Sequence, residues 1–129
     1  MQQTPMRGPG TTILVVDDDA LITLNTADIL NERGHKVLEA FSAQEALSLI
    51  EQHPDIGVLI TDFGMPGMNG LELAEVARRH KPDLPILLTS GYAELPDHNG
   101  IAFARLEKPF HEEELLASLN QLLGSTAVE

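Results

Sequence analysis

Cysteine and tryptophan are absent from the chain of 129 residues, and aromatic residues make up only 4% of it. Without cysteine the chain has no disulfide bonds and no thiolate metal sites. This composition fits a reducing compartment, and we expect a cytoplasmic protein. A long apolar segment is missing as well. We therefore expect no transmembrane helix and, in the polar residues 1–11, no signal peptide.

Positive charge is scarce. The chain has 8 lysine and arginine residues against 20 aspartate and glutamate residues, and its formal net charge is −12. Nucleic acids and anionic membranes repel such a surface, so we predict neither as a direct partner. Solvation of the surface explains most of the acids, and the informative ones are those in unusual positions.

Short apolar runs alternate with segments of helical spacing, and Gly34 and Gly124 are expected to end two of the helices. This alternation predicts an α/β fold, a doubly wound parallel sheet with helices on both faces. At this length we expect one domain over residues 12–124, between an N-terminal tail (1–11) and a C-terminal tail (125–129). The expected strands are 13–16, 37–40, 56–61, 86–89 and 102–106, and the expected helices are 20–33, 43–52, 69–80 and 112–123.

Carboxylates stand at the ends of two of these strands. Asp17, Asp18 and Asp19 follow the first predicted strand, and Asp62 follows the third. The carboxyl ends of parallel strands share one edge of the sheet, where open α/β folds bind their ligands. Carboxylates crowded there raise one another's pKa unless a cation relieves the repulsion, and Mg²⁺ is a hard cation that prefers oxygen ligands. The pattern predicts a Mg²⁺ site, and Asp18 or Asp19 is also expected to cap the next helix.

Further polar residues are placed at the same edge. Thr89 and Ser90 end the fourth predicted strand, and Lys108 precedes Pro109 after the fifth. By itself a strand-end hydroxyl is most often part of a turn, and a lysine is most often a solvated charge. Here the proline restricts the backbone of Lys108, which favours a fixed position beside the aspartates.

Four segments in this order resemble the receiver domain of two-component response regulators, in particular its single-domain bacterial type. The resemblance covers residues 12–123. It implies a flavodoxin-like, five-stranded parallel sheet of order 2-1-3-4-5. The four segments are Val16 to Asp19 (VDDD), Asp62 to Gly70 (DFGMPGMNG), Leu88 to Tyr92 (LTSGY) and Lys108 to Phe110 (KPF).

The resemblance implies a role for each polar residue. Asp62 takes a phosphoryl group from a histidine kinase or a histidine phosphotransfer protein, Lys108 neutralises the phosphoryl oxygens, and Ser90 donates a hydrogen bond to the phosphate. The phosphorylated form then changes its contacts with an output protein that the sequence does not identify. Such a domain is not an enzyme beyond catalysing its own phosphorylation and dephosphorylation. The implied Mg²⁺ ligands are Asp17, Asp18, Asp62 and the backbone carbonyl of Gly64.

Two features depart from the family pattern. Arg105 stands three residues before Lys108, where the family usually has an aromatic residue. The stretch between Ser90 and Lys108 is short and contains the helix breakers Pro96 and Gly100. We therefore expect the fourth helix of the usual fold to be short or missing.

Two other functions are compatible with parts of the sequence. In a phosphatase of the haloacid dehalogenase type, Asp17 would be the nucleophile and Asp19 the acid and base, but Asp62 would have no role. Alternatively, a receiver that no longer accepts phosphate would be a binding module that works without phosphorylation. The complete set of implied phosphorylation residues argues against the binding module, because an unused site has no reason to keep mutually repelling acids.

Overall fold

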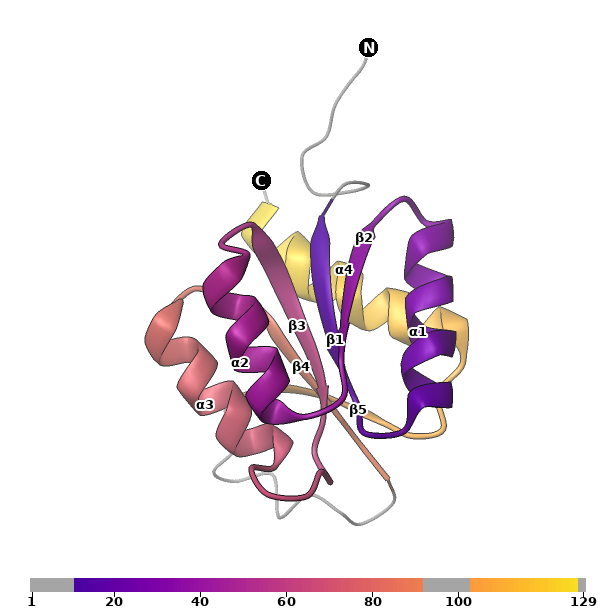
Figure 1. The fold of residues 1–129 in the computed structure, drawn as a ribbon. Helices are drawn as coiled ribbons and strands as arrows, with labels where there is room; N and C mark the ends of the chain where they lie inside the picture. The colour runs from indigo at the N-terminus through magenta and orange to yellow at the C-terminus, as the bar shows by residue number, and fades with distance from the viewer. Residues whose placement is uncertain (1–10, 92–102, 128–129) are drawn as a thin grey trace.

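The computed structural model describes residues 11–91 and 103–127, which contain one parallel sheet of order β2-β1-β3-β4-β5 (Figure 1). The predicted fold class and strand order are confirmed. The strands are β1 (Thr12–Val16), β2 (Lys36–Ala40), β3 (Ile56–Asp62), β4 (Ile86–Ser90) and β5 (Ala104–Glu107), and the helices are α1 (Ala20–Glu32), α2 (Ala43–Gln52), α3 (Gly70–His80) and α4 (Glu112–Ala127).

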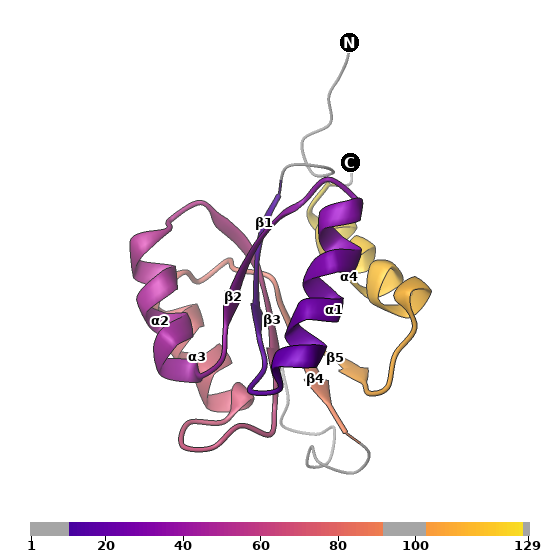
Figure 2. The same ribbon diagram turned by 45° about the vertical axis from the view of Figure 1, so that its right-hand side comes forward.

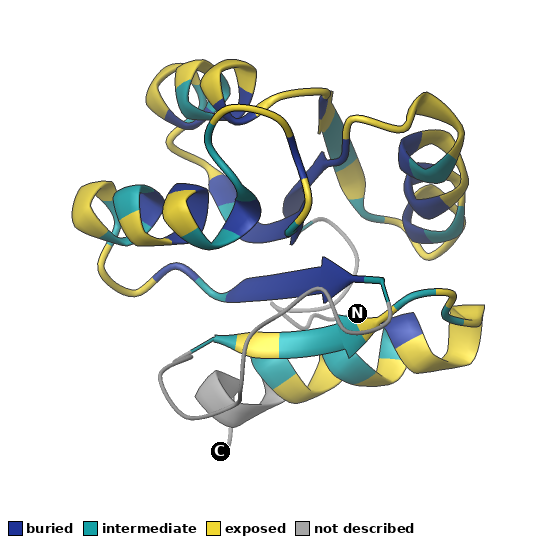
Figure 3. Cartoon of the chain, turned by 90° about the horizontal axis from the view of Figure 1, so that it is seen from below, coloured by how far each residue is buried: buried dark blue, intermediate teal, exposed yellow. Residues whose placement is uncertain are grey.

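Helices cover both faces of the sheet. α1 and α4 lie on one face and α2 and α3 on the other, as two views of the ribbon show (Figures 1 and 2). Successive strand residues point to opposite faces, so Leu14 and Leu88 join the apolar cluster with α2 and α3, whereas Val15 and Leu87 join the cluster with α1 and α4. The strands β1 and β4 are buried along their whole length, and the outer sides of the helices are exposed (Figure 3).

Three helices begin at a side chain that caps their N-terminus. Asp19 caps α1, and Asn69 caps α3 in a reciprocal capping box with Glu72. At α2 the Ser42 hydroxyl accepts a hydrogen bond from the amide of Glu45, and the Glu45 carboxylate accepts one from the amide of Phe41, the residue before Ser42. These caps lie at the carboxyl edge of the sheet, so they order the loops around the predicted site.

The last helix runs further than predicted. α4 continues through Gly124 to Ala127, so the predicted helix end at Gly124 is wrong, and residues 125–127 belong to the helix. One glycine inside a helix costs only about 1 kcal/mol relative to alanine, which a helix packed on a sheet tolerates. α1, by contrast, ends at Glu32, shortly before Gly34, whose φ of 90° is readily adopted by glycine.

The prediction of a short or missing fourth helix falls on residues 92–102. These residues lie outside the described part of the chain, as does most of the predicted N-terminal tail. Over residues 11–91 and 103–127, no helix is both long and apolar enough to cross a membrane.

Candidate functional site

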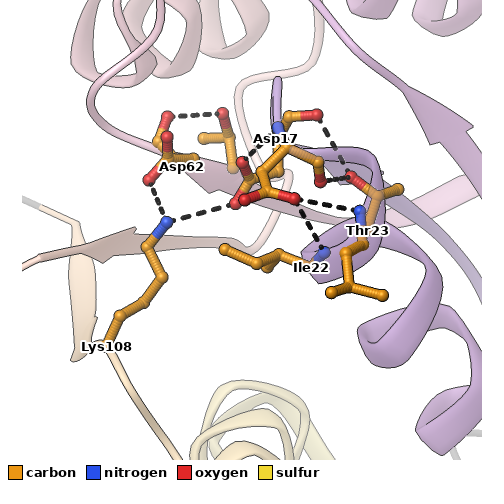
Figure 4. Close-up of polar contacts among 8 residues, drawn as sticks. Asp17, Ile22, Thr23, Asp62 and Lys108 are labelled. Carbon is orange, nitrogen blue, oxygen red and sulfur yellow. Dashed lines mark hydrogen bonds and ion pairs between the residues drawn. The ribbon is translucent and has the colours of Figure 1, made fainter.

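The polar residues at the ends of the strands meet at the carboxyl edge of the sheet. β1 and β3 are neighbours, and Asp17 and Asp62 stand at their ends. β5 is joined to β4 at the same edge, because the amide of Lys108 donates to the carbonyl oxygen of Ser90 at 2.7 Å. The sheet order therefore brings residues that are distant in the chain into one place (Figure 4).

The side chain of Lys108 lies between two buried aspartates (Figure 4). Its Nζ is 2.8 Å from Asp62 Oδ1 and 3.2 Å from Asp17 Oδ2. The Asp62 and Asp17 side chains are only 5% and 4% exposed, and that of Lys108 is 18% exposed. When both carboxyls are ionised, one ammonium group faces two buried negative charges, and the site carries excess negative charge.

Burial raises the pKa of the Asp17 carboxyl, and the charge of Asp62 adds to the rise. The hydrogen bond from the Asp19 amide and the Lys108 ammonium act in the opposite direction without cancelling it. For the Lys108 ammonium, burial lowers the pKa, but contact with Asp62 and the charge of Asp17 outweigh burial, so the pKa of Lys108 is raised. The raised pKa of Lys108 reflects the negative charge around its ammonium group, whereas the raised pKa of Asp17 chiefly reflects burial.

A metal ion fits at this edge. Asp17, Asp18 and Asp62 each offer a carboxylate oxygen, and the three atoms lie within 4.8 Å of one another. The ammonium of Lys108 is the ion-pair partner of the buried Asp62 Oδ1, at 2.8 Å, and it also pairs with Asp17. Two buried carboxylates therefore share one ammonium group. The remaining negative charge and the all-oxygen donor set together fit a hard cation.

The three consecutive aspartates in the turn between β1 and α1 make different contacts. Asp19 Oδ1 accepts hydrogen bonds from the amides of Leu21 at 3.0 Å and Ile22 at 3.4 Å, so Asp19 is the helix cap. Asp17 Oδ1 accepts the amide of Asp19 at 2.9 Å. The exposed Asp18 is not the cap, and its carboxylate lies in the cluster that could hold a metal.

Other predicted residues lie around this cluster. Ser90 is buried at the end of β4, next to β3. Gly64 is exposed, in the loop that follows Asp62. Arg105 is half-buried on β5, opposite Leu88 in the strand register. The roles of Ser90 and Gly64 toward a phosphoryl group or a cation stay predictions.

Gly70, the first residue of α3, is a structural determinant of the site that sequence reasoning missed. A Cβ atom there would overlap the carbonyl oxygen of Asp62 and would lie 2.9 Å from Phe63 Cα. The Gly70 amide also donates to the carbonyl oxygen of Phe63 at 2.9 Å. α3 therefore packs directly on the backbone that carries Asp62, and the missing side chain of glycine permits this approach.

We expect Gly70→Ala to destabilise the fold and to displace Asp62. Overpacking costs about 1–3 kcal/mol, and the upper end applies here because backbone atoms cannot rotate away from the new methyl group. Urea denaturation measures the free energy of unfolding. Gly57→Ala is the matched control, because its Cβ would first meet a side-chain atom of Thr11, at 3.3 Å. Equal losses in the two variants would contradict a special role of Gly70.

The sequence matches one protein family over most of its length. A family model described as the response regulator receiver domain matches residues 13–120. The chain is 36% identical over 124 residues to the chemotaxis protein CheY homologue of Campylobacter jejuni, and the match covers 91% of this chain and 95% of that protein. It is 33% identical over 127 residues to the sensor kinase CckA of Brucella abortus, where the match covers 93% of this chain but 13% of the kinase.

The fold agrees with solved structures of the same kind. The crystal structure of a response regulator receiver protein from Sinorhizobium medicae superposes with a TM-score of 0.82 and 32% sequence identity, covering 90% of this chain and 96% of that chain. The chain belongs to the family of response regulator receiver domains.

Proposed function

We propose that Asp62 accepts a phosphoryl group from a phosphohistidine, and that Mg²⁺ bound by Asp17, Asp18 and Asp62 is required for the transfer. The observation that supports this most directly is the contact of Lys108 with Asp17 and Asp62 at the edge of the sheet where the three carboxylates cluster. Phosphoryl transfer needs little covalent chemistry from a protein beyond the nucleophile, because positioning and neutralisation of charge lower most of the barrier.

Each side chain has a distinct task in this reaction. A carboxylate oxygen of Asp62 forms the new bond to phosphorus while the bond from phosphorus to the histidine nitrogen breaks, and the nitrogen keeps the electron pair. Lys108 already contacts Asp62 and neutralises a phosphoryl oxygen. Ser90 donates its hydroxyl hydrogen to another phosphoryl oxygen. When bound, the cation supplies further positive charge at the phosphoryl group, and the carbonyl oxygen of Gly64 completes its protein ligands.

The donor is a histidine kinase or a histidine phosphotransfer protein, and the response is a changed contact with an output protein in the cytoplasm. Two relatives support this setting, since one is named a sensor kinase and the other a chemotaxis protein. The formation and hydrolysis of its own phosphoaspartate are the reactions that the domain catalyses.

Incubation with acetyl phosphate and Mg²⁺ tests the proposal. Intact-mass spectrometry should show a single phosphoryl adduct that fails to form when EDTA removes the cation. Borohydride reduction and peptide mapping should then place the adduct on Asp62. An adduct on Asp17 would instead support a phosphatase of the haloacid dehalogenase type, and no adduct would support a binding module that works without phosphorylation.

A further inference from the structure

A buried hydroxyl lies beneath the turn that carries the aspartates. Thr23, near the N-terminus of α1, is 0% exposed. Its Oγ1 lies 3.1 Å from the carbonyl oxygen of Asp17 and 3.1 Å from the carbonyl oxygen of Asp19 (Figure 4). A hydroxyl has one hydrogen to donate, so the two carbonyl oxygens share it. The hydroxyl thus connects both ends of the acidic segment.

Only one of these two contacts is explained by the helix itself. Threonine inside a helix often donates to the carbonyl oxygen four residues earlier, and the contact with Asp19 is of this kind. Asp17 is six residues before Thr23 and lies outside the helix, beyond the end of β1. The contact with Asp17 therefore ties the end of β1 to the start of α1.

Thr23 restrains the backbone on both sides of Asp18, because it contacts the carbonyl oxygens of Asp17 and Asp19. Asp18 is exposed, so packing of its own side chain contributes little to its position. Its neighbours are restrained instead, because Asp17 Oδ1 accepts the amide of Asp19 and the Asp19 side chain caps α1. A turn that is ordered before the cation binds avoids part of the conformational entropy cost of binding.

We propose that Thr23 is a positioning residue for the metal site, and that its hydroxyl sets the affinity for Mg²⁺ by holding the carbonyl oxygens of Asp17 and Asp19. This inference rests on the proposed function, in which Asp17 and Asp18 bind the cation. Replacing a residue that hydrogen-bonds to a metal ligand, without touching the metal itself, typically weakens metal binding by about 10–100-fold. Because Thr23 acts through the backbone of the turn, we expect a loss of about tenfold.

Calorimetric titration with MgCl₂ alone tests the proposal on the full chain. Thr23→Val removes the hydroxyl and keeps the size and branching of the side chain, and its Kd for Mg²⁺ should rise about tenfold. Thr23→Ser keeps the hydroxyl and should bind Mg²⁺ as the unchanged protein does. Thr26→Val is the matched control, because Thr26 is also a buried threonine of α1. Its Kd should stay within about twofold of the unchanged protein, below the tenfold change expected at Thr23.

The Mg²⁺ dependence of phosphorylation by acetyl phosphate shows whether Thr23 positions the metal ligands or only stabilises the fold. In Thr23→Val the Mg²⁺ concentration at half-maximal rate should rise about tenfold, whereas the rate at saturating Mg²⁺ should stay within about twofold of the original. A general loss of structure would lower the maximal rate and leave the dependence on Mg²⁺ in place. Should Thr23→Val not fold, Thr23→Cys replaces it, because a thiol is a weak donor.

An unchanged Kd in the folded Thr23→Val variant, or an equal loss in Thr26→Val, would overturn the role of Thr23 while leaving the proposed function intact. Failure of the unchanged protein to bind Mg²⁺ would overturn the proposed metal site and this inference together. The two failures are therefore distinguishable in one set of titrations.

Discussion

Replacing Asp62 by asparagine is expected to abolish phosphoryl incorporation from acetyl phosphate and from a phosphohistidine donor. The asparagine amide has nearly the same size as the carboxylate, but it is a far weaker nucleophile and no longer offers a negative charge to a cation. Asp62 is buried beside Lys108, so a solvent-exposed acid cannot take its place in the site. Phosphoryl content measured by intact-mass spectrometry should fall from about one group per chain to below detection.

Two further variants show whether the loss is specific. Asp28→Asn removes an exposed acid of α1 and should leave phosphorylation unchanged. Asp17→Asn removes a proposed metal ligand but leaves the acceptor, so it should still be phosphorylated at raised Mg²⁺ concentration. Phosphorylated Asp62→Asn protein, together with an inactive Asp17→Asn variant, would refute the assignment of the acceptor.

Replacing Lys108 by methionine is expected to lower the free energy of unfolding at neutral pH without Mg²⁺ by about 3 kcal/mol. Removal of one partner of a buried ion pair costs about 3–5 kcal/mol, and the lower end applies because the Lys108 side chain is still 18% exposed. Methionine keeps the aliphatic length of lysine, so the change chiefly removes charge. Asp17 and Asp62 would then repel each other without a counter-charge. Urea denaturation with and without MgCl₂ measures the difference.

The loss in the free energy of unfolding caused by Lys108→Met should become smaller as the pH falls. The ammonium lowers the pKa of Asp17, so its removal raises further a pKa that burial already holds above its ordinary value. A carboxyl with a raised pKa in the folded state binds more protons there than in the unfolded chain. Its protonation therefore favours folding at low pH, and this stability is lost as the pH rises through the raised pKa. We expect the smallest difference between variant and original in mildly acidic buffer.

Mg²⁺ should restore part of the stability of Lys108→Met, because a cation takes over as the counter-charge. At 100 times its Kd, a ligand that binds only the folded state adds about 2.7 kcal/mol. Lys36→Met is the control, since Lys36 is exposed at the start of β2, at the opposite edge of the parallel sheet from the aspartates. A Lys108→Met variant as stable as Lys36→Met, at every pH and Mg²⁺ concentration, would disprove the coupling of Lys108 to the aspartates.

The positions of Asp17, Asp62, Ser90 and Lys108 at one edge could be predicted from the sequence. Apolar runs of strand length mark buried parallel strands, and the carboxyl ends of such strands share an edge of the sheet. Strand order did not follow from the periodicity of the runs. It came from the resemblance to receiver domains, and the structure and the family match bear it out.

Other features depended on contacts that a linear pattern does not record. Gly124 reads as a helix end, yet α4 passes through it, because the cost of one glycine is smaller than the gain from packing the helix on the sheet. Asp18 and Asp19 are equally good capping residues by type, and the backbone geometry of the turn assigns the cap to Asp19.

The sequence by itself therefore determined the class of fold and placed acids, a hydroxyl and a lysine at the ends of the predicted strands, since those depend on residue type and local period. The tertiary structure alone decided how closely these groups approach and what supports them. Gly70 reads as an ordinary helix residue until α3 is seen to pack on the backbone of Asp62. Thr23 reads as one more polar residue of the predicted helix 20–33 until its hydroxyl is seen to reach Asp17 beyond the helix. Both contacts join separate elements, and their geometry is set by packing of the whole domain.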